Sequence, residues 1–552
     1  MKTLRAFTNK EPDRRWGHSL GGVFSAARSA SAPAGRRTMR FRTRAGWRLL
    51  GLVTIVGGLI ATGQAGALGR GVGDQVPGQA NNSSSALAPL AAAAPTRARL
   101  ASGPQPAEFI VYPRPPDFQM YETEELRQSC IRHGLPEDCG GEPSIGVNPF
   151  TNSAMVQMML TTARVRWDDT QQPPAATWSN VSYTGFVSTS DPVLITDRAT
   201  GRTFNVQLCP DVPCNATTGV VSTDDDGASW NEFPTRLVSP NPDKPVIGSG
   251  NYHAPAPAGA SFPSAVYVCI ADGFPWPSGN VNCHRSDDGG RTWGPPRAVM
   301  TGPGPCLPFA GEIEVDRDGT VYLPLAHCGG SQGLAISNDN GETWQVTTVP
   351  GVRGAEQTLD QYPDVAWDRG GRVYYAASSR GRPVVATSDD HGTHWTAPVD
   401  VLGAEIKYAQ FPTVVAGDNG RAAVAFLGST TPGHPENQNY DGIWHLYVAV
   451  TVDGGATWNT TDVTGGDPVQ RGCIGSKLTG SCKRRNLLDF NDSAIDAQGR
   501  VLIAYADGCV SQTCVGANGA PSDSNASDYA VARQVSGPRM LAAFDPHEGA
   551  RR

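Results

Sequence analysis

The sequence predicts an all-β protein, a six-bladed β-propeller whose blades are four-stranded antiparallel sheets. Composition is the first reason: of 552 residues, 64 are Gly and 44 are Pro, and only 18% are charged, which favours a turn-rich β protein. A repeat of strand pairs is the second, because periods of ~50–60 residues are typical of propeller blades. The third is that no helical periodicity of useful length appears between residues 107 and 545.

Five copies of an eight-residue pattern, [S/T]-x-D-x-G-x-[S/T]-W, mark the repeat. They begin at residues 223, 286, 337, 388 and 451, and His394 replaces the second hydroxyl residue in the fourth copy. A short apolar segment, a D-x-x-G turn and a second apolar segment precede the boxes, which indicates a hairpin. The clearest hairpins are 311–326, 362–377 and 411–426, and a sixth at 491–506 has no box after it. The sequence therefore predicts that each blade consists of three strands, a box and a fourth strand. A seventh blade remains possible if the segment 158–222 contains one.

The boxes are expected to build the fold. A short carboxylate after a strand can accept backbone N–H groups and hold a turn, Gly allows positive φ, and Trp can bury its ring against the strands. A catalytic centre is needed once, whereas this pattern repeats with the blades. The predicted structural residues are Asp225, Trp230, Asp288, Trp293, Asp339, Trp344, Asp390, Trp395, Asp453 and Trp458.

The N-terminal region predicts export. Residues 1–48 hold twelve Lys/Arg, an apolar run follows at 49–62, and "AGA" at 65–67 resembles a cleavage site. We expect a signal peptide over 1–67, with the true start possibly at Met39; an uncleaved membrane anchor is the alternative. Residues 68–105, rich in Ala, Gly, Ser and Pro, predict a flexible linker. The propeller is assigned to 106–545 and a tail to 546–552.

Charge and cysteine content agree with an extracytoplasmic protein. Without residues 1–67, 33 basic residues face 50 acidic ones, a net charge of −17 with His neutral, so a nucleic-acid partner is not expected. Twelve cysteines in an exported chain predict disulfides, and the absence of C-x-x-C pairs argues against zinc. Pairing by proximity in the sequence gives Cys130/Cys139, Cys209/Cys214, Cys269/Cys283, Cys306/Cys328, Cys473/Cys482 and Cys509/Cys514.

Five such boxes within six four-stranded units resemble the Asp-box (BNR) repeats of the sialidase superfamily, over about residues 140–535. The resemblance implies a sialidase-like propeller. Active members bind the substrate carboxylate with three arginines and use a Tyr nucleophile, an assisting Glu and an Asp acid/base. Here Glu142 occupies the first arginine position, Arg380 lies two residues late for another, and Phe490 stands in the Tyr position. Sialidase catalytic residues are therefore predicted to be absent.

The residues that open the inner strands are expected to converge at one end of the propeller axis. Paired carboxyl groups could act as general acid and base or nucleophile, and aromatic rings could stack on sugars. The candidate catalytic residues are Glu142, Glu312, Asp360 and Asp492. The candidate substrate-binding residues are Tyr252, His253, Tyr362, Phe411 and Phe490.

We therefore expect a secreted or cell-envelope propeller that acts on extracellular carbohydrate, as a glycosidase-like hydrolase or as a glycan binder. The alternative is a non-catalytic protein-interaction propeller of the cell envelope. No cofactor and no metal are expected, and membrane contact is expected only through an uncleaved anchor. Which terminal segment closes the ring, 107–113 or 539–545, is left open by the sequence.

Overall fold

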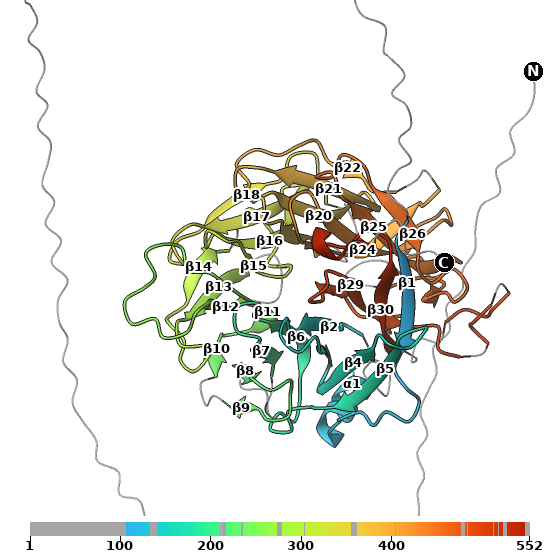
Figure 1. Ribbon diagram of the computed structural model, residues 1–552, viewed down its shortest axis with the longest axis horizontal. Coiled ribbons are helices and arrows are strands. Elements are labelled where there is room, and N and C mark those ends of the chain that lie inside the picture. The colour runs from blue at the N-terminus through green and yellow to red at the C-terminus, as the bar shows by residue number, and fades with distance from the viewer. Residues whose placement is uncertain are drawn as a thin grey trace, which may run out of the picture. The chain divides into compact units, whose positions relative to one another are not determined.

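Seven antiparallel sheets, each built on four strands, surround a common axis in the computed structural model (Figure 1). The structure describes residues 106–546 except 133–140, 210, 212–216, 233–235, 273–278, 303, 355–361, 403–404, 476–480, 483, 512, 517 and 523–526. The first strand of each sheet contacts the first strands of both neighbouring sheets, which closes a ring in the order β28, β2, β6, β11, β15, β19 and β23. The described part of the chain is therefore a seven-bladed β-propeller.

Each blade is formed by strands that follow one another in the chain. Blade 1 contains β2 (Ser144–Val147), β3 (Ala154–Met158), β4 (Thr161–Asp168) and β5 (Ala175–Asn180). Blade 2 contains β6 (Ser190–Thr196), β7 (Thr203–Leu208) and β8 (Thr217–Thr223), with β9 (Asn231–Glu232) and β10 (Leu237–Val238) both on β8. Blade 3 contains β11 (Pro242–Gly250), β12 (Ala265–Asp272), β13 (Asn280–Ser286) and β14 (Arg297–Met300).

The remaining blades follow the same order. Blade 4 contains β15 (Glu314–Val315), β16 (Val321–Cys328), β17 (Ser331–Ser337) and β18 (Gln345–Thr348). Blade 5 contains β19 (Asp364–Trp367), β20 (Val373–Ser379), β21 (Arg382–Ser388) and β22 (Val399–Asp400). Blade 6 contains β23 (Tyr408–Ala416), β24 (Ala422–Ser429), β25 (Ile443–Thr451) and β26 (Asn459–Asp462), with β27 (Gln470–Arg471) also on β25. Blade 7 contains β28 (Asp492–Ile495), β29 (Val501–Asp507), β30 (Asp528–Ser536) and β1 (Glu108–Pro113).

The predicted count of six blades is wrong, because the segment 158–222 contains parts of two blades. It holds the third and fourth strands of blade 1 and the first three strands of blade 2. Blade 1 has no box between its last two strands, and the first box in the sequence, at residue 223, belongs to blade 2. The signal for the missing blade is the turn after β6. There Asp197 Oδ1 accepts a backbone N–H of its own turn, that of Thr200, at 2.9 Å. In the later hairpins Asp316 Oδ1 likewise accepts the Asp318 N–H, and Asp368 Oδ1 accepts the Gly370 N–H.

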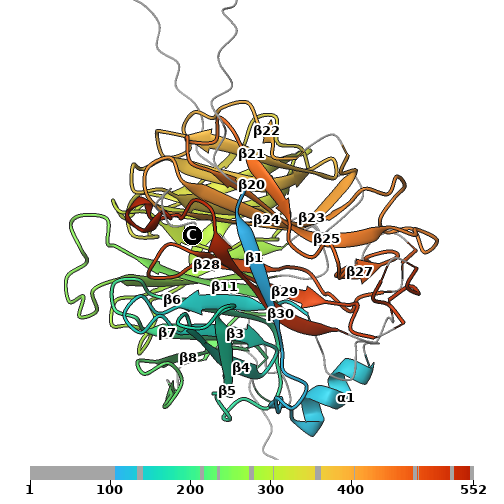
Figure 2. The same cartoon turned by 45° about the vertical axis from the view of Figure 1, so that its right-hand side comes forward.

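The two ends of the described chain close the ring together. Strand β1 pairs antiparallel with β30, so the N-terminal segment supplies the outer strand of blade 7 (Figure 2). The segment 539–545 instead forms the short 3-10 helix η1 (Ala542–Phe544). Helix α1 (Glu124–Arg132) follows β1, and the Thr123 hydroxyl caps it by accepting the Leu126 N–H at 3.2 Å. No helix in the described ranges is long and apolar enough to cross a membrane.

The five boxes share one hydrogen-bond pattern, which agrees with their predicted structural role. In the first, Asp225 Oδ1 accepts the Thr223 hydroxyl and the Ser229 N–H, each at 2.8 Å, and Oδ2 accepts the Ser229 hydroxyl at 2.6 Å. In the fourth, Nδ1 of His394 takes the place of that hydroxyl, 2.6 Å from Asp390. Burial opposes ionisation of Asp225, but these hydrogen bonds hold its pKa below the ordinary value. The same pattern is centred on Asp288, Asp339 and Asp453.

The fourth position of each box docks on the preceding blade. The residue at this position has positive φ in all five boxes. In chain order these residues are Asp226, Gly289, Asn340, His391 and Gly454. Gly, Asn, Asp and His are the residue types that adopt this conformation most readily. Asn148 of blade 1 donates to Asp226 at 2.7 Å, and Nδ1 of His391 lies 2.9 Å from Asp316 of blade 4. The boxes therefore fix the blades to one another.

Four predicted disulfides are confirmed, and they join segments within single blades or their loops. They are Cys269–Cys283, Cys306–Cys328, Cys473–Cys482 and Cys509–Cys514. Cys269 and Cys283 are directly paired across β12 and β13. The other two predicted pairs include residues outside the described ranges, as do the predicted signal peptide and linker.

Candidate functional site

Five of the seven innermost strands have a residue–proline pair just before them or within their first five residues. The pairs are Glu142–Pro143, Asp191–Pro192, Lys244–Pro245, Tyr362–Pro363 and Phe411–Pro412. Four of these leading residues have positive φ: 53° at Glu142, 44° at Asp191, 37° at Lys244 and 54° at Phe411. Non-glycine residues in this conformation cost of order 1–3 kcal/mol each and gather at functional sites. The pairing register also shifts at three of these positions, in β6, β11 and β23, and such bulges redirect side chains.

Glu142 and Asp489 form a carboxyl pair whose pKa values shift in opposite directions. Glu142 is buried, and burial followed by the charges of Asp191 and Asp489 raises its pKa well above the ordinary value. Burial acts on Asp489 too, but Arg485 binds both of its oxygens, with Nη2 2.9 Å from Oδ2, and holds its pKa below the ordinary value. Glu142 also hydrogen-bonds to Asp489. Within the pair, Glu142 therefore holds a proton more readily than a free glutamate does, and Asp489 ionises more readily than a free aspartate does.

Lys244 places a buried ammonium group beside this pair. Its Nζ lies 3.2 Å from the ring centroid of Phe490 and 4.8 Å from that of Tyr362, and its side chain forms no ion pair within the described ranges. Burial lowers its pKa, whereas the surrounding carboxylates raise it. The neighbouring Asp243 has its pKa raised to about 7 by burial and by Asp191, to which it is hydrogen-bonded.

A second layer of acids lies further along the inner strands than the residue–proline pairs. Asp364, for example, comes two residues after Tyr362. Asp492 Oδ2 accepts the Ile145 N–H of blade 1 at 2.7 Å, and Asp364 Oδ2 accepts the Val414 N–H of blade 6 at 2.8 Å. The other oxygen of each carboxylate accepts the following backbone N–H. Asp492, a predicted catalytic residue, therefore joins blade 7 to blade 1 through its backbone bonds.

Glu312 has no hydrogen bond within the described ranges, and burial followed by Asp492 and Asp364 raises its pKa well above the ordinary value.

A cavity of about 20 Å³ lies between the two layers, which is room for about one water molecule or one ligand hydroxyl. Nδ2 of Asn491 is buried there and has no hydrogen-bond partner among the residues that the structure describes, and Lys244 is a second donor on the wall. The polar and aromatic residues that line it are Lys244, Glu312, Tyr362, Asp364, Phe490 and Asn491. We call Glu142, Asp489, Arg485 and these lining residues the axial cluster.

The structure brings together Glu142, Glu312, Asp492, Tyr362 and Phe490 of the predicted site. The face of the Phe490 ring carries Lys244 and the side chain is buried, so it is not an open platform for a sugar. The remaining predicted catalytic residue, Asp360, lies outside the described ranges.

Three predicted substrate-binding residues lie away from the axial cluster. Tyr252 and His253 follow the last residue of β11, whereas Asp243 and Lys244 lie at its beginning. The backbone of His253 instead exchanges two hydrogen bonds with the Asn340 side chain, at 2.7 and 2.9 Å. Phe411 is buried in the hydrophobic core of blades 6 and 7.

The sequence interpretation missed Lys244 and Asp191 because it aligned the blades on their hairpin turns. The residue–proline pairs provide a better alignment. They open the segments "EPSIG", "DPVLI", "KPVIG", "YPDVA" and "FPTVV" at residues 142, 191, 244, 362 and 411. Within the described ranges, no group of three or more His, Cys, Asp or Glu residues is arranged to hold a metal ion.

Comparison with known proteins does not assign a family. No protein-family model matches the sequence, and no curated protein matches it. Similar solved structures include the lectin BP39L from Burkholderia pseudomallei, at 12% identity and a TM-score of 0.44, covering 67% of this chain and 93% of the lectin. The Hadza microbial sialidase Hz136 is 15% identical with a TM-score of 0.36, covering 70% of this chain and 73% of the sialidase. An α-L-arabinanase from Penicillium chrysogenum is 14% identical with a TM-score of 0.36, covering 62% of this chain and 92% of the arabinanase.

Proposed function

We propose that the protein is an exported Asp-box propeller of the sialidase superfamily that hydrolyses a neutral glycoside at its axial cluster. The observation that carries the proposal is that the buried Glu142 is hydrogen-bonded to Asp489, whose two oxygens are bound by Arg485, so that the pKa of Glu142 is raised while that of Asp489 is lowered. Adjacent acids whose pKa values are pushed apart in this way are typical of acid–base catalysis. The five boxes support the superfamily, and the disulfides suit an oxidising compartment outside the cytoplasm.

Glu142 is assigned the role of general acid. It would donate its proton to the oxygen that leaves when the glycosidic bond breaks, and the ionised Asp489 would favour its reprotonation from solvent. The small cavity beside Lys244 and Asn491 has room for one sugar hydroxyl or for the attacking water. Glu312, which has no backbone hydrogen bond in the described part of the chain, is the second acid that can contact a substrate there.

A neutral substrate fits this cluster better than a sialic acid. A substrate carboxylate is best bound by an arginine that presents two free N–H groups. Both terminal nitrogens of Arg485 are already bound to Asp489. A substrate carboxylate would also meet Asp489 and Asp191 at close range, where like charges repel.

The test is a hydrolysis screen of the purified protein on neutral aryl glycosides and one aryl sialoside. Glu142→Gln and Glu312→Gln should each lower kcat/KM, and loss of the general acid should cost about 10²–10⁴-fold. Because Glu142 acts in its protonated form, kcat/KM of the unmodified protein should fall as pH rises through its raised pKa. Asp507→Asn is the matched control, since Asp507 is another buried acid, with a pKa of about 7, that lies on β29 outside the axial cluster.

Each result decides between defined alternatives. Cleavage of the sialoside alone would contradict the assignment of a neutral substrate. Turnover that survives Glu142→Gln would show that the general acid is another group. Absence of turnover together with binding on a glycan array would replace hydrolysis by glycan binding, and absence of both would favour the protein-interaction alternative.

A further inference from the structure

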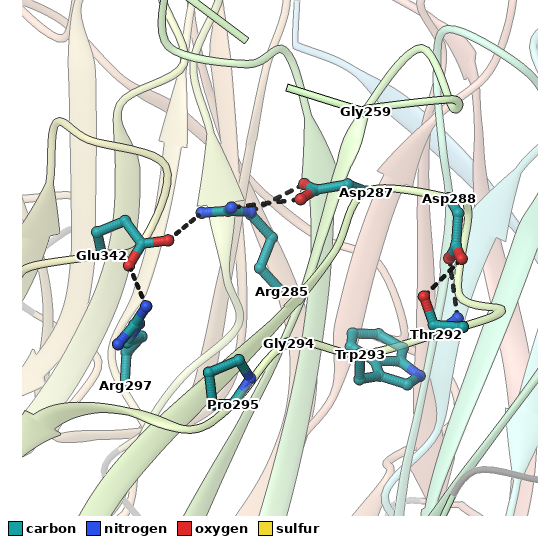
Figure 3. A pocket seen from close by; sticks show the side chains of 11 residues that line it. Gly259, Arg285, Asp287, Asp288, Thr292, Trp293, Gly294, Pro295, Arg297 and Glu342 are labelled. Atoms are coloured by element: carbon teal, nitrogen blue, oxygen red, sulfur yellow. Dashed lines mark hydrogen bonds and ion pairs between the residues drawn. The ribbon is translucent and has the colours of Figure 1, made fainter. Parts of the chain in front are cut away.

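A second, larger cavity lies between blades 3 and 4, at their boxes (Figure 3). Its volume is about 300 Å³, at the lower end of the range for small-molecule sites. None of the residues that line it belongs to the axial cluster. They are Gly259, Arg285, Asp287, Asp288, Thr292, Trp293, Gly294, Pro295, Arg297, Gly341 and Glu342.

Part of this arrangement recurs between other blades and serves the fold. In blade 2, Arg202 binds both oxygens of Asp224, at 2.6 and 2.8 Å, and also donates to the Gly289 carbonyl of the next box at 3.0 Å. In blade 5, Arg372 makes the same contacts with Asp389 and with the Gly454 carbonyl of the next box. In blade 3, Arg285 binds Asp287 and the Asn340 carbonyl. These arginines join neighbouring blades.

The cavity between blades 3 and 4 differs from those interfaces by two added charges. Nη1 of Arg285 lies 3.0 Å from one oxygen of Glu342, and Nη2 of Arg297 lies 2.6 Å from the other oxygen (Figure 3). Glu342 is the sixth residue of its box, where the other boxes have Ala, Arg, Thr and Ala. The side chains of Glu342 and Arg297 are 42% and 46% exposed, so both remain open to solvent.

The space above Arg285 is open, unlike that above Arg202. The ring of Phe262 covers the guanidinium of Arg202 at 4.9 Å. At the blade 3 cavity, a Cβ added to Gly259 would meet nothing within 4 Å, and one added to Gly294 would meet only the Arg285 carbonyl oxygen, at 3.4 Å. Small residues therefore leave this ion-pair network accessible.

We propose that this cavity binds one neutral sugar ring, as a site separate from the axial cluster. Arg285 and Arg297 supply fixed N–H donors, and Asp287 and Glu342 supply acceptors next to them, which is the alternation that neighbouring sugar hydroxyls require. The ring of Trp293 and Pro295 line the same wall and offer apolar surface for the C–H face of a sugar. Two arginines and three carboxylates, those of Asp287, Asp288 and Glu342, line the cavity. The cavity therefore has no net positive charge with which to bind an anion. The proposal does not depend on hydrolysis at the axial cluster.

The experiment is saturation-transfer NMR followed by calorimetric titration of the full-length protein with the methyl glycosides of glucose, galactose, mannose and fucose. At least one should bind, and Glu342→Ala should weaken that binding by roughly 10-fold or more, because it removes a charged acceptor. Gly294→Leu is the second variant. It should abolish binding by filling the cavity while the four ion-pairing side chains stay in place.

Two controls separate this site from the fold and from the axial cluster. Asp389→Asn weakens the corresponding arginine pair of blade 5 and should bind the sugar as the unmodified protein does. Glu142→Gln changes the axial cluster, and the binding that Glu342→Ala weakens should persist in it. The proposal is overturned if none of the four glycosides binds at ~10 mM, if Glu342→Ala and Gly294→Leu bind normally, or if Glu142→Gln removes the binding.

Discussion

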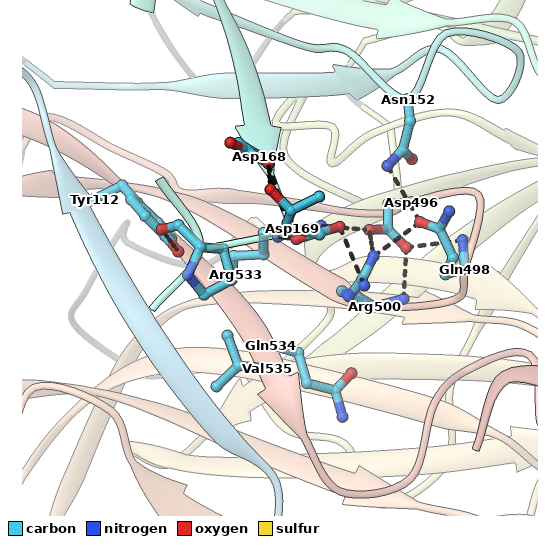
Figure 4. A network of polar contacts seen from close by, with 12 residues as sticks. Tyr112, Asn152, Asp168, Asp169, Asp496, Gln498, Arg500, Arg533, Gln534 and Val535 are labelled. Carbon is cyan, nitrogen blue, oxygen red and sulfur yellow. Dashed lines mark hydrogen bonds and ion pairs between the residues drawn. The ribbon is translucent and has the colours of Figure 1, made fainter. Parts of the chain in front are cut away.

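Arg533 should be the most sensitive single position for the stability of the ring, because it joins blade 7 to blade 1 inside the protein. It is fully buried on β30 and binds both oxygens of Asp169, at 2.5 and 2.9 Å (Figure 4). Its Nη2 also lies 3.3 Å from Asp496, and its guanidinium lies 4.8 Å from the centre of the Trp167 ring. Asp169 follows the last residue of β4, so these contacts cross the closure of the propeller.

The substitution Arg533→Met keeps the aliphatic volume and removes the charge. Removing one partner of a buried ion pair costs about 3–5 kcal/mol. The side chain of Asp169 is 36% exposed and Arg500 stays 3.2 Å from it, so water and Arg500 compensate in part. We therefore expect the free energy of unfolding to fall by about 3 kcal/mol, the lower end of that range.

Equilibrium denaturation in guanidinium chloride measures this change, with Arg372→Met as the matched control. Arg372 binds Asp389 in the same two-point geometry, but the two side chains are 33% and 69% exposed, and exposed pairs contribute at most about 1 kcal/mol. The reasoning is refuted if Arg533→Met costs less than the control.

The loss should also depend on pH. The hydrogen bond from Arg533, against the opposing effect of burial, lowers the pKa of Asp169. Its ionised form therefore stabilises the fold above the unfolded pKa of about 4, and this contribution is lost as the pH falls through the lower folded value. The difference between Arg533→Met and the unmodified protein should shrink in acid.

Three further predictions concern the termini, the disulfides and the boxes. A chain that begins at Arg114 lacks β1 and leaves β30 as an unpaired edge, so it should aggregate in size-exclusion chromatography, and a monodisperse monomer would contradict this. Replacing Cys306 and Cys328, 22 residues apart, by serine should lower the free energy of unfolding by ~3 kcal/mol in chemical denaturation; an unchanged midpoint would argue against it. The His394 backbone N–H and then its side chain lower the pKa of Asp390 to about 2, so the carboxylate stabilises the box above the unfolded pKa of about 4 and loses this effect as pH falls through about 2. Asp390→Ala should therefore lower the thermal midpoint at pH 7 by more than at pH 2, and an equal shift at both pH values would count against the box geometry.

Local patterns predicted the blades well where a turn or box marks them. The [S/T]-x-D-x-G-x-[S/T]-W boxes all form the predicted turns, because every hydrogen bond of Asp225 or Asp339 within its box goes to a residue at most four positions away. The same reliance on local marks produced the wrong count, since blade 1 has no box. Its strands pair in the same way, but their stability comes from packing against blades 2 and 7.

The candidate site was predicted only in part, for a related reason. Glu142 and Glu312 could be predicted because each lies two residues before an inner strand, β2 or β15, a position that the hairpin pattern marks in the sequence. Lys244 and Glu142 gain their significance from neighbours more than 100 positions away in the chain, Phe490 and Tyr362 for Lys244 and Asp489 for Glu142. No spacing in the sequence shows that Arg485 lowers the pKa of Asp489 while burial raises that of Glu142.

The sequence by itself determined the class of fold, the turns, the boxes and four disulfides, because each depends on residues close together in the chain. Only the tertiary structure decided the number of blades, the closure by β1 and the directions in which the pKa values of the axial acids shift. Those features depend on which strands lie side by side and on how much water reaches a carboxyl group. Both are set by the packing of all seven blades around the axis.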